Sequence, residues 1–350
     1  PDRGPFNRDK LWEPFHQEQP AYIVPPVANL TDGPSGLTFY PGTGFGSEMN
    51  DQFLICDFRG GPANSGIHSF KLQSDGGGYQ LSNHRQLIWG VLATDVAFGP
   101  DGGLYVSDWV DGWDGLGKGR MYRLADPERG DSERAREVRS LLASRWSERR
   151  TDQLIRDLEH IDRRIRLEAQ WELAKRGEVR ALIRVARSGS AETTLAARLH
   201  AMWGIGQVLR ASKTDNADVL AETRPLLSDD SGEVRAAAAK LFGEAGDLSA
   251  TKRLIAMMRD PSARVRYFAI RALDELAGGE ESAMQEPLSD RIAVDVIKLF
   301  GDPSTSPKWN NDPALRHAAV MLLVRLRQTD LLENLSKHKS ADVRRLAVVS

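Results

Sequence analysis

Hydrophobic and polar positions follow two different periods along the chain. From about residue 35 to 125, apolar and polar residues alternate in runs of about five to eight, and Gly, Pro, Asn and Asp bound each run, which predicts short β-strands. The segment ATDVAFGPDGGLYVSDW, residues 93–109, reads as a complete hairpin with a glycine-rich turn. After Thr151, the apolar residues recur at the spacing of amphipathic helices. The sequence therefore predicts a sheet region followed by a helical region.

The helical region repeats itself. An arginine recurs about every 30 to 50 residues, apolar residues follow it at helical spacing, and an acidic residue precedes most copies. Helix pairs that bury their apolar faces only by stacking on neighbouring pairs have this pattern, so we expect a HEAT-repeat α-solenoid. The recurring arginines are Arg166, Arg198, Arg235, Arg266, Arg316 and Arg344.

The sheet region consists of two similar units, at about 35–90 and 93–125. Each has a strand and a turn, then a strand that ends in an acidic residue, then a further strand, and repeated units of this size are typical of β-propeller blades. Two blades do not close a ring, so we expect this chain to be an internal piece of a longer protein. The predicted fold is mixed, β then α, with an extended connection at 1–27, the C-terminal blades of a propeller at 28–125, a linker helix at 126–150 and the solenoid at 151–350.

Composition narrows the functional classes. Lys and Arg number 47 against 49 Asp and Glu, so no excess charge favours nucleic-acid binding. The single cysteine, Cys56, excludes internal disulfides and thiolate zinc sites. No apolar run approaches the length needed to span a bilayer. A phosphate-binding loop, a dinucleotide fingerprint and a G-x-S-x-G motif are also missing from the sequence.

Several long motifs between about Trp12 and Asp126 resemble a known family. GPSGLTFYPGTGF, DQFLICDFRGGPANSGIHSF and VLATDVAFGPDGGLYVSDWVDGWDGLGKGRMYRL are similar to segments of the haem-binding, membrane-bound-dehydrogenase-like proteins of planctomycetes. The resemblance implies a glucose/sorbosone dehydrogenase-type propeller, then HEAT repeats, then a cytochrome c domain with a C-x-x-C-H motif. That motif is absent here, so haem c is expected only in a domain outside this chain. A periplasmic or cell-envelope location follows from the resemblance alone.

The loop CDFRGGPANSG is the first candidate site. In quinoprotein sugar dehydrogenases, arginines at the corresponding strand end meet the carboxylates of the quinone, and an arginine fork fits a carboxylate with two hydrogen bonds. The alternative is that Arg59 pairs with Asp57 or with a neighbouring blade. The resemblance thus implies contacts to pyrroloquinoline quinone from Arg59, Asn64, Lys118 and Arg120.

The loop SDWVDGWDGLGKGR is the second candidate site. It carries three aspartates at intervals of three, Asp108, Asp111 and Asp114, and carboxylates in a glycine-bearing loop are candidate ligands of Ca²⁺. The alternative is that these acids cap turns and pair with the basic residues that follow. Trp109 and Trp113 lie between them and are candidates to stack on sugar rings.

Two functions follow. The first is a piece of a sugar or polyol oxidoreductase that uses pyrroloquinoline quinone and Ca²⁺ and passes electrons to the cytochrome c domain of the same longer protein. His84, on a predicted strand, is its candidate catalytic base, and the piece alone is expected to be inactive. The alternative is a non-catalytic scaffold of propeller and HEAT repeats that binds a polysaccharide or, on the HEAT surface, a protein partner.

Overall fold

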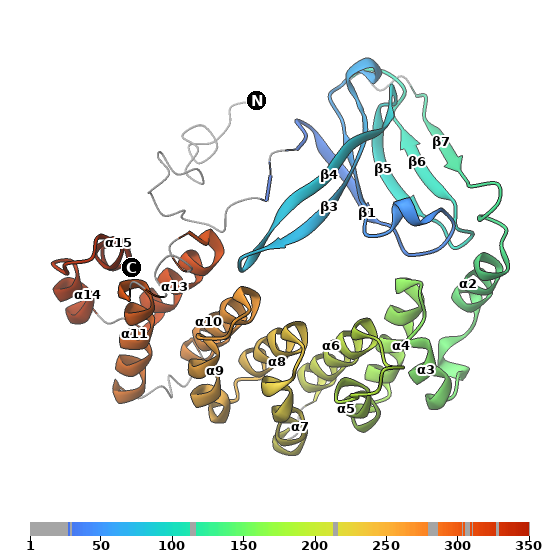
Figure 1. Ribbon diagram of the computed structural model, residues 1–350. Helices are drawn as coiled ribbons and strands as arrows, with labels where there is room; N and C mark the ends of the chain where they lie inside the picture. Colours follow the sequence, from blue (N-terminus) through green and yellow to red (C-terminus); the bar gives the residue numbers. More distant parts are fainter. Residues whose placement is uncertain are drawn as a thin grey trace.

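The computed structural model describes residues 27–28, 30–112, 117–212, 216–278, 286–302, 304, 309, 311–326 and 329–349. It contains two small β-sheets that lie beside an arc of helices (Figure 1). The chain leaves the second sheet, passes through α2 (Glu133–Ala143) and enters the arc at α3 (Thr151–Asp157). The order of the elements is therefore the expected one, sheets first and helices afterwards.

Both sheets are antiparallel meanders in which each strand pairs with the next one along the chain. The first has the order β1-β2-β3-β4 and the second the order β5-β6-β7, and their strands begin and end close to the two units of the sequence pattern. The strands are β1 (Pro34–Phe39), β2 (Phe53–Asp57), β3 (Gly66–Asp75), β4 (Gly78–Trp89), β5 (Ala93–Phe98), β6 (Leu104–Asp108) and β7 (Arg120–Leu124).

The two sheets share one hydrophobic core, and β1 lies beside β5. The turns after these two strands touch through their backbones: a Cβ at Gly44 (φ +102°) would overlap the carbonyl oxygen of Gly102 (φ +77°). Only glycine allows this approach at a positive φ. The core side chains are Tyr40, Met49, Leu54, Cys56, Ile67, Ala93, Val96, Leu104 and Val106.

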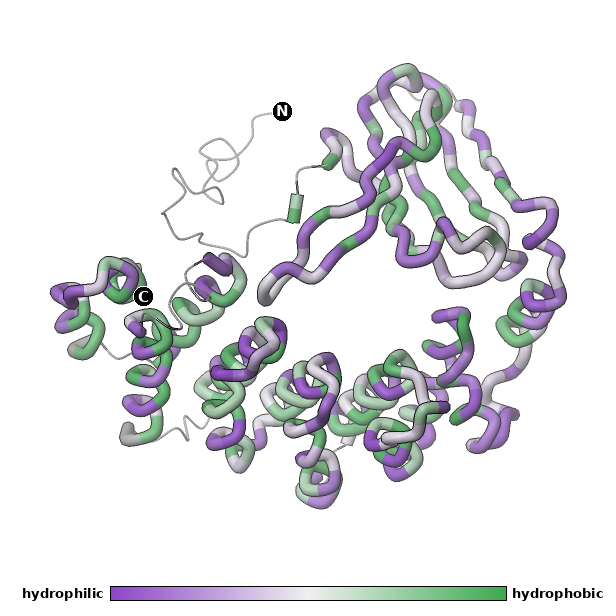
Figure 2. Tube along the Cα trace, in the orientation of Figure 1, coloured by the Kyte–Doolittle hydropathy of each residue, from purple (hydrophilic) through white to green (hydrophobic). Residues whose placement is uncertain are grey.

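The helices pair into a solenoid. In Figure 1, α4, α6, α8 and α10 lie on the side that faces the sheets, and α5, α7 and α9 lie on the other side. Hydrophobic and hydrophilic residues alternate along each helix (Figure 2), and a single apolar core runs through the whole array. The further helices are α4 (Arg163–Lys175), α5 (Val179–Ala186), α6 (Leu195–Ala211), α7 (Ala217–Thr223), α8 (Gly232–Glu244), α9 (Thr251–Met257), α10 (Ala263–Ala277), α11 (Glu286–Gly301), α13 (Pro313–Leu326), α14 (Thr329–Leu335) and α15 (Ala341–Val349).

Most of the recurring arginines have the same surroundings, whereas Arg198 donates through Nε to the carbonyl oxygen of Ala186 and through Nη2 to Asp229. In four of them, Nη1 donates to the carbonyl oxygens five and six residues earlier, which belong to the turn between the two helices of a pair. Arg235 also reaches the next repeat, where Nε and Nη2 each lie 2.8 Å from a carboxylate oxygen of Asp260. The arginine is thus a structural clamp on the turn, as its recurrence indicates. The four that clamp in this way are Arg166, Arg235, Arg266 and Arg344.

The sheets contact the solenoid near α4. Thr43 Oγ1 donates to Asp162 Oδ2 at 2.5 Å, and Arg164 Nη1 donates to the carbonyl oxygen of Gly99 at 2.7 Å. The backbone N–H of Arg163 donates to the carbonyl oxygen of Pro41 at 2.9 Å. The turns after β1 and β5 are therefore fixed to the N-terminal end of α4.

A second contact lies far along the solenoid. The long hairpin of β3 and β4 reaches α10 and α13 with its tip (Figure 1), where Gly77 N–H donates to Asp312 Oδ2 at 2.6 Å. The guanidinium carbon of Arg264 lies 5.2 Å from the ring centre of Tyr79, a cation–π contact. Both attachments use the N-terminal ends of the inner helices, which are those on the side that faces the sheets. These contacts do not cover the C-terminal halves of α6 and α8.

In the part of the chain that the structure describes, no helix is long and apolar enough to cross a membrane. Trp309, between the recurring arginines Arg266 and Arg316, is 1 % exposed and packs against Phe300, with 5.4 Å between ring centres. A buried indole of this size stabilises the core rather than offering a binding surface.

Candidate functional site

His84 ends a chain of hydrogen bonds that crosses three strands. Asp57 on β2 and His68 on β3 are buried, and His68 Nε2 lies 3.3 Å from Asp57 Oδ2. His68 Nδ1 lies 2.8 Å from Nε2 of His84 on β4. If the carboxylate accepts from His68 Nε2–H, His68 Nδ1 is an acceptor and His84 donates to it. The arrangement orients the exposed imidazole of His84.

The pKa values of this chain follow from its surroundings. Burial alone would raise the pKa of Asp57, but hydrogen bonds from Arg59, from Gly33 N–H and from His68 outweigh it and hold that pKa below its usual range. Burial, and then the neighbouring His68, lowers the pKa of His84. At neutral pH this series of hydrogen bonds therefore combines an ionised Asp57 carboxylate with a neutral His84 imidazole.

The residues expected to meet a quinone lie in the connection between β2 and β3 and at the start of β7. Arg59 Nε donates to Asp57 Oδ2 at 2.8 Å, and Arg59 Nη1 lies 3.0 Å from Asp32 Oδ2. Its charge is thus already neutralised by two carboxylates, which is the ion pair named as the alternative for this residue. The others are exposed: Asn64 ends a short 3₁₀ helix, Lys118 precedes β7, and Arg120 Nη1 donates to the Tyr122 hydroxyl at 3.2 Å.

The predicted calcium loop is described only in part. Asp108 is buried at the end of β6 and accepts from Val110 N–H at 2.9 Å, as a turn cap does. Asp111 and Trp109 are exposed, whereas Asp114 and Trp113 lie outside the described residues. Within the described ranges, no three or more His, Cys, Asp or Glu side chains are placed to hold a metal ion. The Ca²⁺ ligands and the sugar-stacking tryptophans remain predictions.

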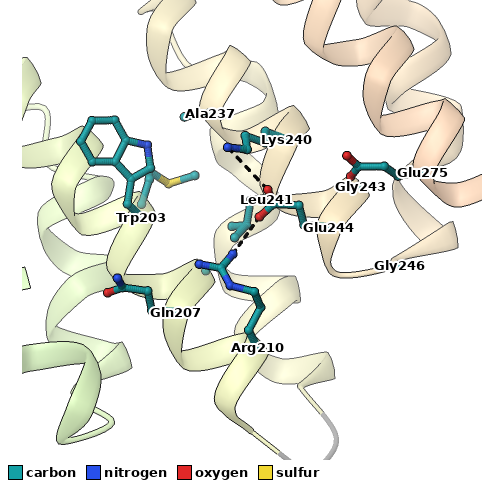
Figure 3. A pocket seen from close by; sticks show the side chains of 12 residues that line it. Trp203, Gln207, Arg210, Ala237, Lys240, Leu241, Gly243, Glu244, Gly246 and Glu275 are labelled. Atoms are coloured by element: carbon teal, nitrogen blue, oxygen red, sulfur yellow. Dashed lines mark hydrogen bonds and ion pairs between the residues drawn. The ribbon is translucent and has the colours of Figure 1, made fainter. Parts of the chain in front are cut away.

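A groove of about 930 Å³ lies on the solenoid, between α6, α8 and the end of α10 (Figure 3). Glycines and apolar side chains form the floor of the groove, and polar side chains and one indole surround it. The floor includes Met202, Gly206, Leu241 and Gly243, and the surrounding side chains are Trp203, Gln207, Arg210, Lys240, Glu244 and Glu275.

The groove residues occupy equivalent positions in successive repeats. Trp203 and Lys240 each come five residues after the recurring arginine, and Gln207, Glu244 and Glu275 come nine residues after it. The buried apolar residues of the same helices come three and seven residues after it, so the groove positions lie on the opposite side of the helix. The groove therefore runs across the inner helices, on the side turned away from the outer ones.

A signal for this groove was present in the sequence and was missed. Trp171 and Trp203 occupy the same position in consecutive repeats, and both are 47 % exposed. A large apolar side chain that recurs on the solvent-facing side of stacked helices marks a candidate binding surface. The predicted stacking residues, Trp109 and Trp113, belong to a sheet loop instead.

Ion pairs and hydrogen bonds hold the groove side chains in place. Glu244 accepts from Arg210 at 2.8 Å and pairs with Lys240 at 3.5 Å. The imidazole of His200 packs edge-on against Trp203, with 4.9 Å between ring centres. Burial, and then the nearby Arg166 and Arg163, lowers the pKa of His200 to about 4, so this imidazole is neutral at pH 7.

Comparison with known proteins identifies the class of the helical region. The family model for HEAT repeats matches residues 220–298, which include α8, α9 and most of the groove. The expected HEAT-repeat region is therefore confirmed there. The sheets are small antiparallel meanders, and their membership of a propeller remains a prediction, as does the resemblance to the dehydrogenase-like proteins.

Several solved structures are similar to this chain at a low level. A designed armadillo repeat protein in complex with the peptide (KR)4 is 19% identical, with a TM-score of 0.36 over 57% of this chain and 98% of that one. The complex of CpcE and CpcF of phycocyanin lyase from Nostoc sp. PCC7120 is 17% identical, with a TM-score of 0.36 over 57% and 75%. An engineered protein is 18% identical, with a TM-score of 0.35 over 57% and 94%. No curated protein matches the chain.

Proposed function

We propose that this chain is a non-catalytic scaffold that binds a segment of a partner protein in the groove across α6, α8 and α10. The observation that carries the proposal is the groove itself, which combines an apolar floor, a half-exposed indole and fixed polar groups contributed by three successive repeats. A surface built in this way by stacked repeats is extended and suits an extended chain.

A random peptide library displayed on phage tests this function. The whole chain is immobilised, and the bound peptides are compared with those recovered on two groove variants, Trp203→Ala and Leu241→Arg. We expect peptides that bind the unchanged chain and lose at least tenfold in affinity on both variants, because one variant removes the indole and the other fills the floor with a charge. Equal recovery on all three proteins would contradict the proposal.

A second candidate function is the sugar or polyol oxidoreductase that the resemblance implies. Its support is the Asp57–His68–His84 chain, because a base in such a reaction needs an oriented, neutral imidazole. The quinone is less well supported, since Arg59 has no free charge for a quinone carboxylate while it pairs with Asp57 and Asp32. The periplasmic location, the haem c domain and the sugar partner belong to this same hypothesis.

This second function has its own test. Pyrroloquinoline quinone and Ca²⁺ are added to the longer protein that this hypothesis implies, and binding is measured by the quenching of tryptophan fluorescence, with dye reduction measured on a panel of sugars and polyols. Binding that His84→Ala leaves intact, together with dye reduction that this variant abolishes, would support the oxidoreductase. Absence of both binding and dye reduction in the unchanged longer protein would overturn it.

A further inference from the structure

The groove contains a carboxylate whose bonding is incomplete. Among the described residues, Oε2 of Glu275 is buried without a hydrogen-bond partner, and Oε1 of the same carboxylate has a long contact, 3.9 Å from Nη2 of Arg271. Glu244, by contrast, is paired through both of its oxygens, with Lys240 and with Arg210. Figure 3 shows the Glu275 carboxylate directed toward the groove beside Gly243.

The local packing explains how the carboxylate is held there. Gly243 lets α8 approach α10 closely, because a Cβ at this position would lie 2.6 Å from Cα of Ala272 and 2.9 Å from Oε2 of Glu275. Burial, and then the neighbouring Glu244, raises the pKa of Glu275. Arg271 and Lys240 lower it by less, so the ionised carboxylate is left short of positive charge.

A second group near Trp203 has free donor capacity. Gln170 Oε1 lies 2.7 Å from His200 Nδ1, and Gln170 Nε2 donates to Gln207 Oε1 at 3.2 Å. The amide oxygen of Gln207 is thereby engaged, and its Nε2 group has no partner within the described part of the chain. That amide can donate to a carbonyl oxygen of an extended peptide lying in the groove.

We infer that the groove takes an extended peptide segment with a positively charged side chain, whose cationic group pairs with the partly exposed carboxylate of Glu275 while Gln207 donates to the peptide backbone. This inference rests on the proposed function. Arginine fits best, because its guanidinium bonds a carboxylate through a planar fork. An acidic segment would place a like charge beside the Glu275 carboxylate, and a wholly apolar segment would cover that carboxylate without a counter-charge, so both are disfavoured.

The test uses the peptides selected from the random library. We expect them to share an arginine or a lysine, and Glu275→Gln to weaken their binding about tenfold, since it removes one charge-assisted pair. The matched control is Glu192→Gln, which neutralises an exposed glutamate outside the groove and leaves affinity unchanged. Added salt weakens binding to the unchanged chain more than binding to Glu275→Gln.

The outcomes separate this inference from the proposed function. Selected peptides that lack basic residues, or that bind Glu275→Gln and the unchanged chain equally, would overturn the inference, and the function would stand if Trp203→Ala still abolished binding. Selection of acidic peptides would likewise contradict it. If no peptide binds the unchanged chain better than Trp203→Ala and Leu241→Arg, both ideas fail. Circular dichroism of Glu275→Gln verifies that the solenoid remains folded.

Discussion

The backbone N–H of Gly77 donates to Oδ2 of Asp312 at 2.6 Å, although 235 positions separate the two residues. Asp312 also caps α13, because its Oδ1 accepts from Leu315 N–H at 3.0 Å. One buried carboxylate thus stabilises a helix start and fixes the tip of the β3–β4 hairpin. Asp162 does the same at α4, where it accepts from Arg164 N–H and from the Thr43 hydroxyl.

Replacement of Asp312 separates its two roles. Asp312→Ser keeps an oxygen for the helix cap and removes the second oxygen that Gly77 needs, so hydrogen exchange at the hairpin tip should rise at least tenfold. Asp312→Ala loses both roles and should lower the free energy of unfolding by about 1–3 kcal/mol more than the serine variant. Hydrogen–deuterium exchange and urea unfolding measure the two effects. Unchanged exchange at Gly77 in both variants would show that the hairpin is held by other contacts.

The recurring arginine should not tolerate lysine. Arg235→Lys cannot reach the two carbonyl oxygens of the turn and both oxygens of Asp260 together, so we expect a loss of about 1–3 kcal/mol in the free energy of unfolding. The matched control is Arg145→Lys, because Arg145 and its partner Glu148 are both largely exposed. That control should change stability by no more than about 0.5 kcal/mol. Equal effects would remove the structural role given to Arg235.

Glycine is required where the two sheets meet. Gly44→Ala places a Cβ against the carbonyl oxygen of Gly102 at a positive φ, so we expect a loss of about 2 kcal/mol or more in the free energy of unfolding. Gly189→Ala is the control, because a Cβ there meets nothing within 4 Å and the backbone is not left-handed. Thermal unfolding of both variants tests this, and a neutral Gly44→Ala would contradict the close approach.

The stability of the solenoid should depend on pH through His200. Its pKa is about 4 in the fold and near its ordinary 6.5 in the unfolded chain, so the unfolded state binds more protons between these values. Stability therefore falls as the pH drops below 6.5, by about 2 kcal/mol from this residue at pH 5, and the loss levels off below pH 4. Urea unfolding of the unchanged chain and of His200→Gln at pH 7.5 and 5 measures the difference. The variant should lose that part of the pH dependence, and an identical dependence in both proteins would contradict it.

Local pattern was enough to predict the strands and the repeated helices. The alternation within 93–109 predicted the hairpin of β5 and β6, and the spacing of Arg235 and Arg266 predicted equivalent turns, because both depend on neighbours close in sequence. The recurrence of Trp171 and Trp203 marks the surface, but the shape of the groove depends on how closely α10 approaches α8, which Gly243 permits. No periodicity in the sequence reports such a distance.

The candidate residues of the sheet loops show the same limit. His84 was singled out, but its partners were not, because the Asp57–His68 contact depends on the register of β2, β3 and β4. Arg59 was given two alternatives, and the structure places it beside Asp57 and Asp32. Asp32 lies before the first strand, where the sequence pattern gave no pairing partner.

The two attachments of the sheets also determine how stiff the solenoid is. A solenoid without further contacts bends easily, because small rotations between neighbouring helix pairs add up along its length. Here the sheets are attached to the solenoid at Asp162 and at Asp312. These two attachments limit how far the solenoid can straighten. The curvature of the solenoid is thus fixed before any binding. The surface offered to the proposed peptide segment would therefore lose little conformational entropy when the peptide binds.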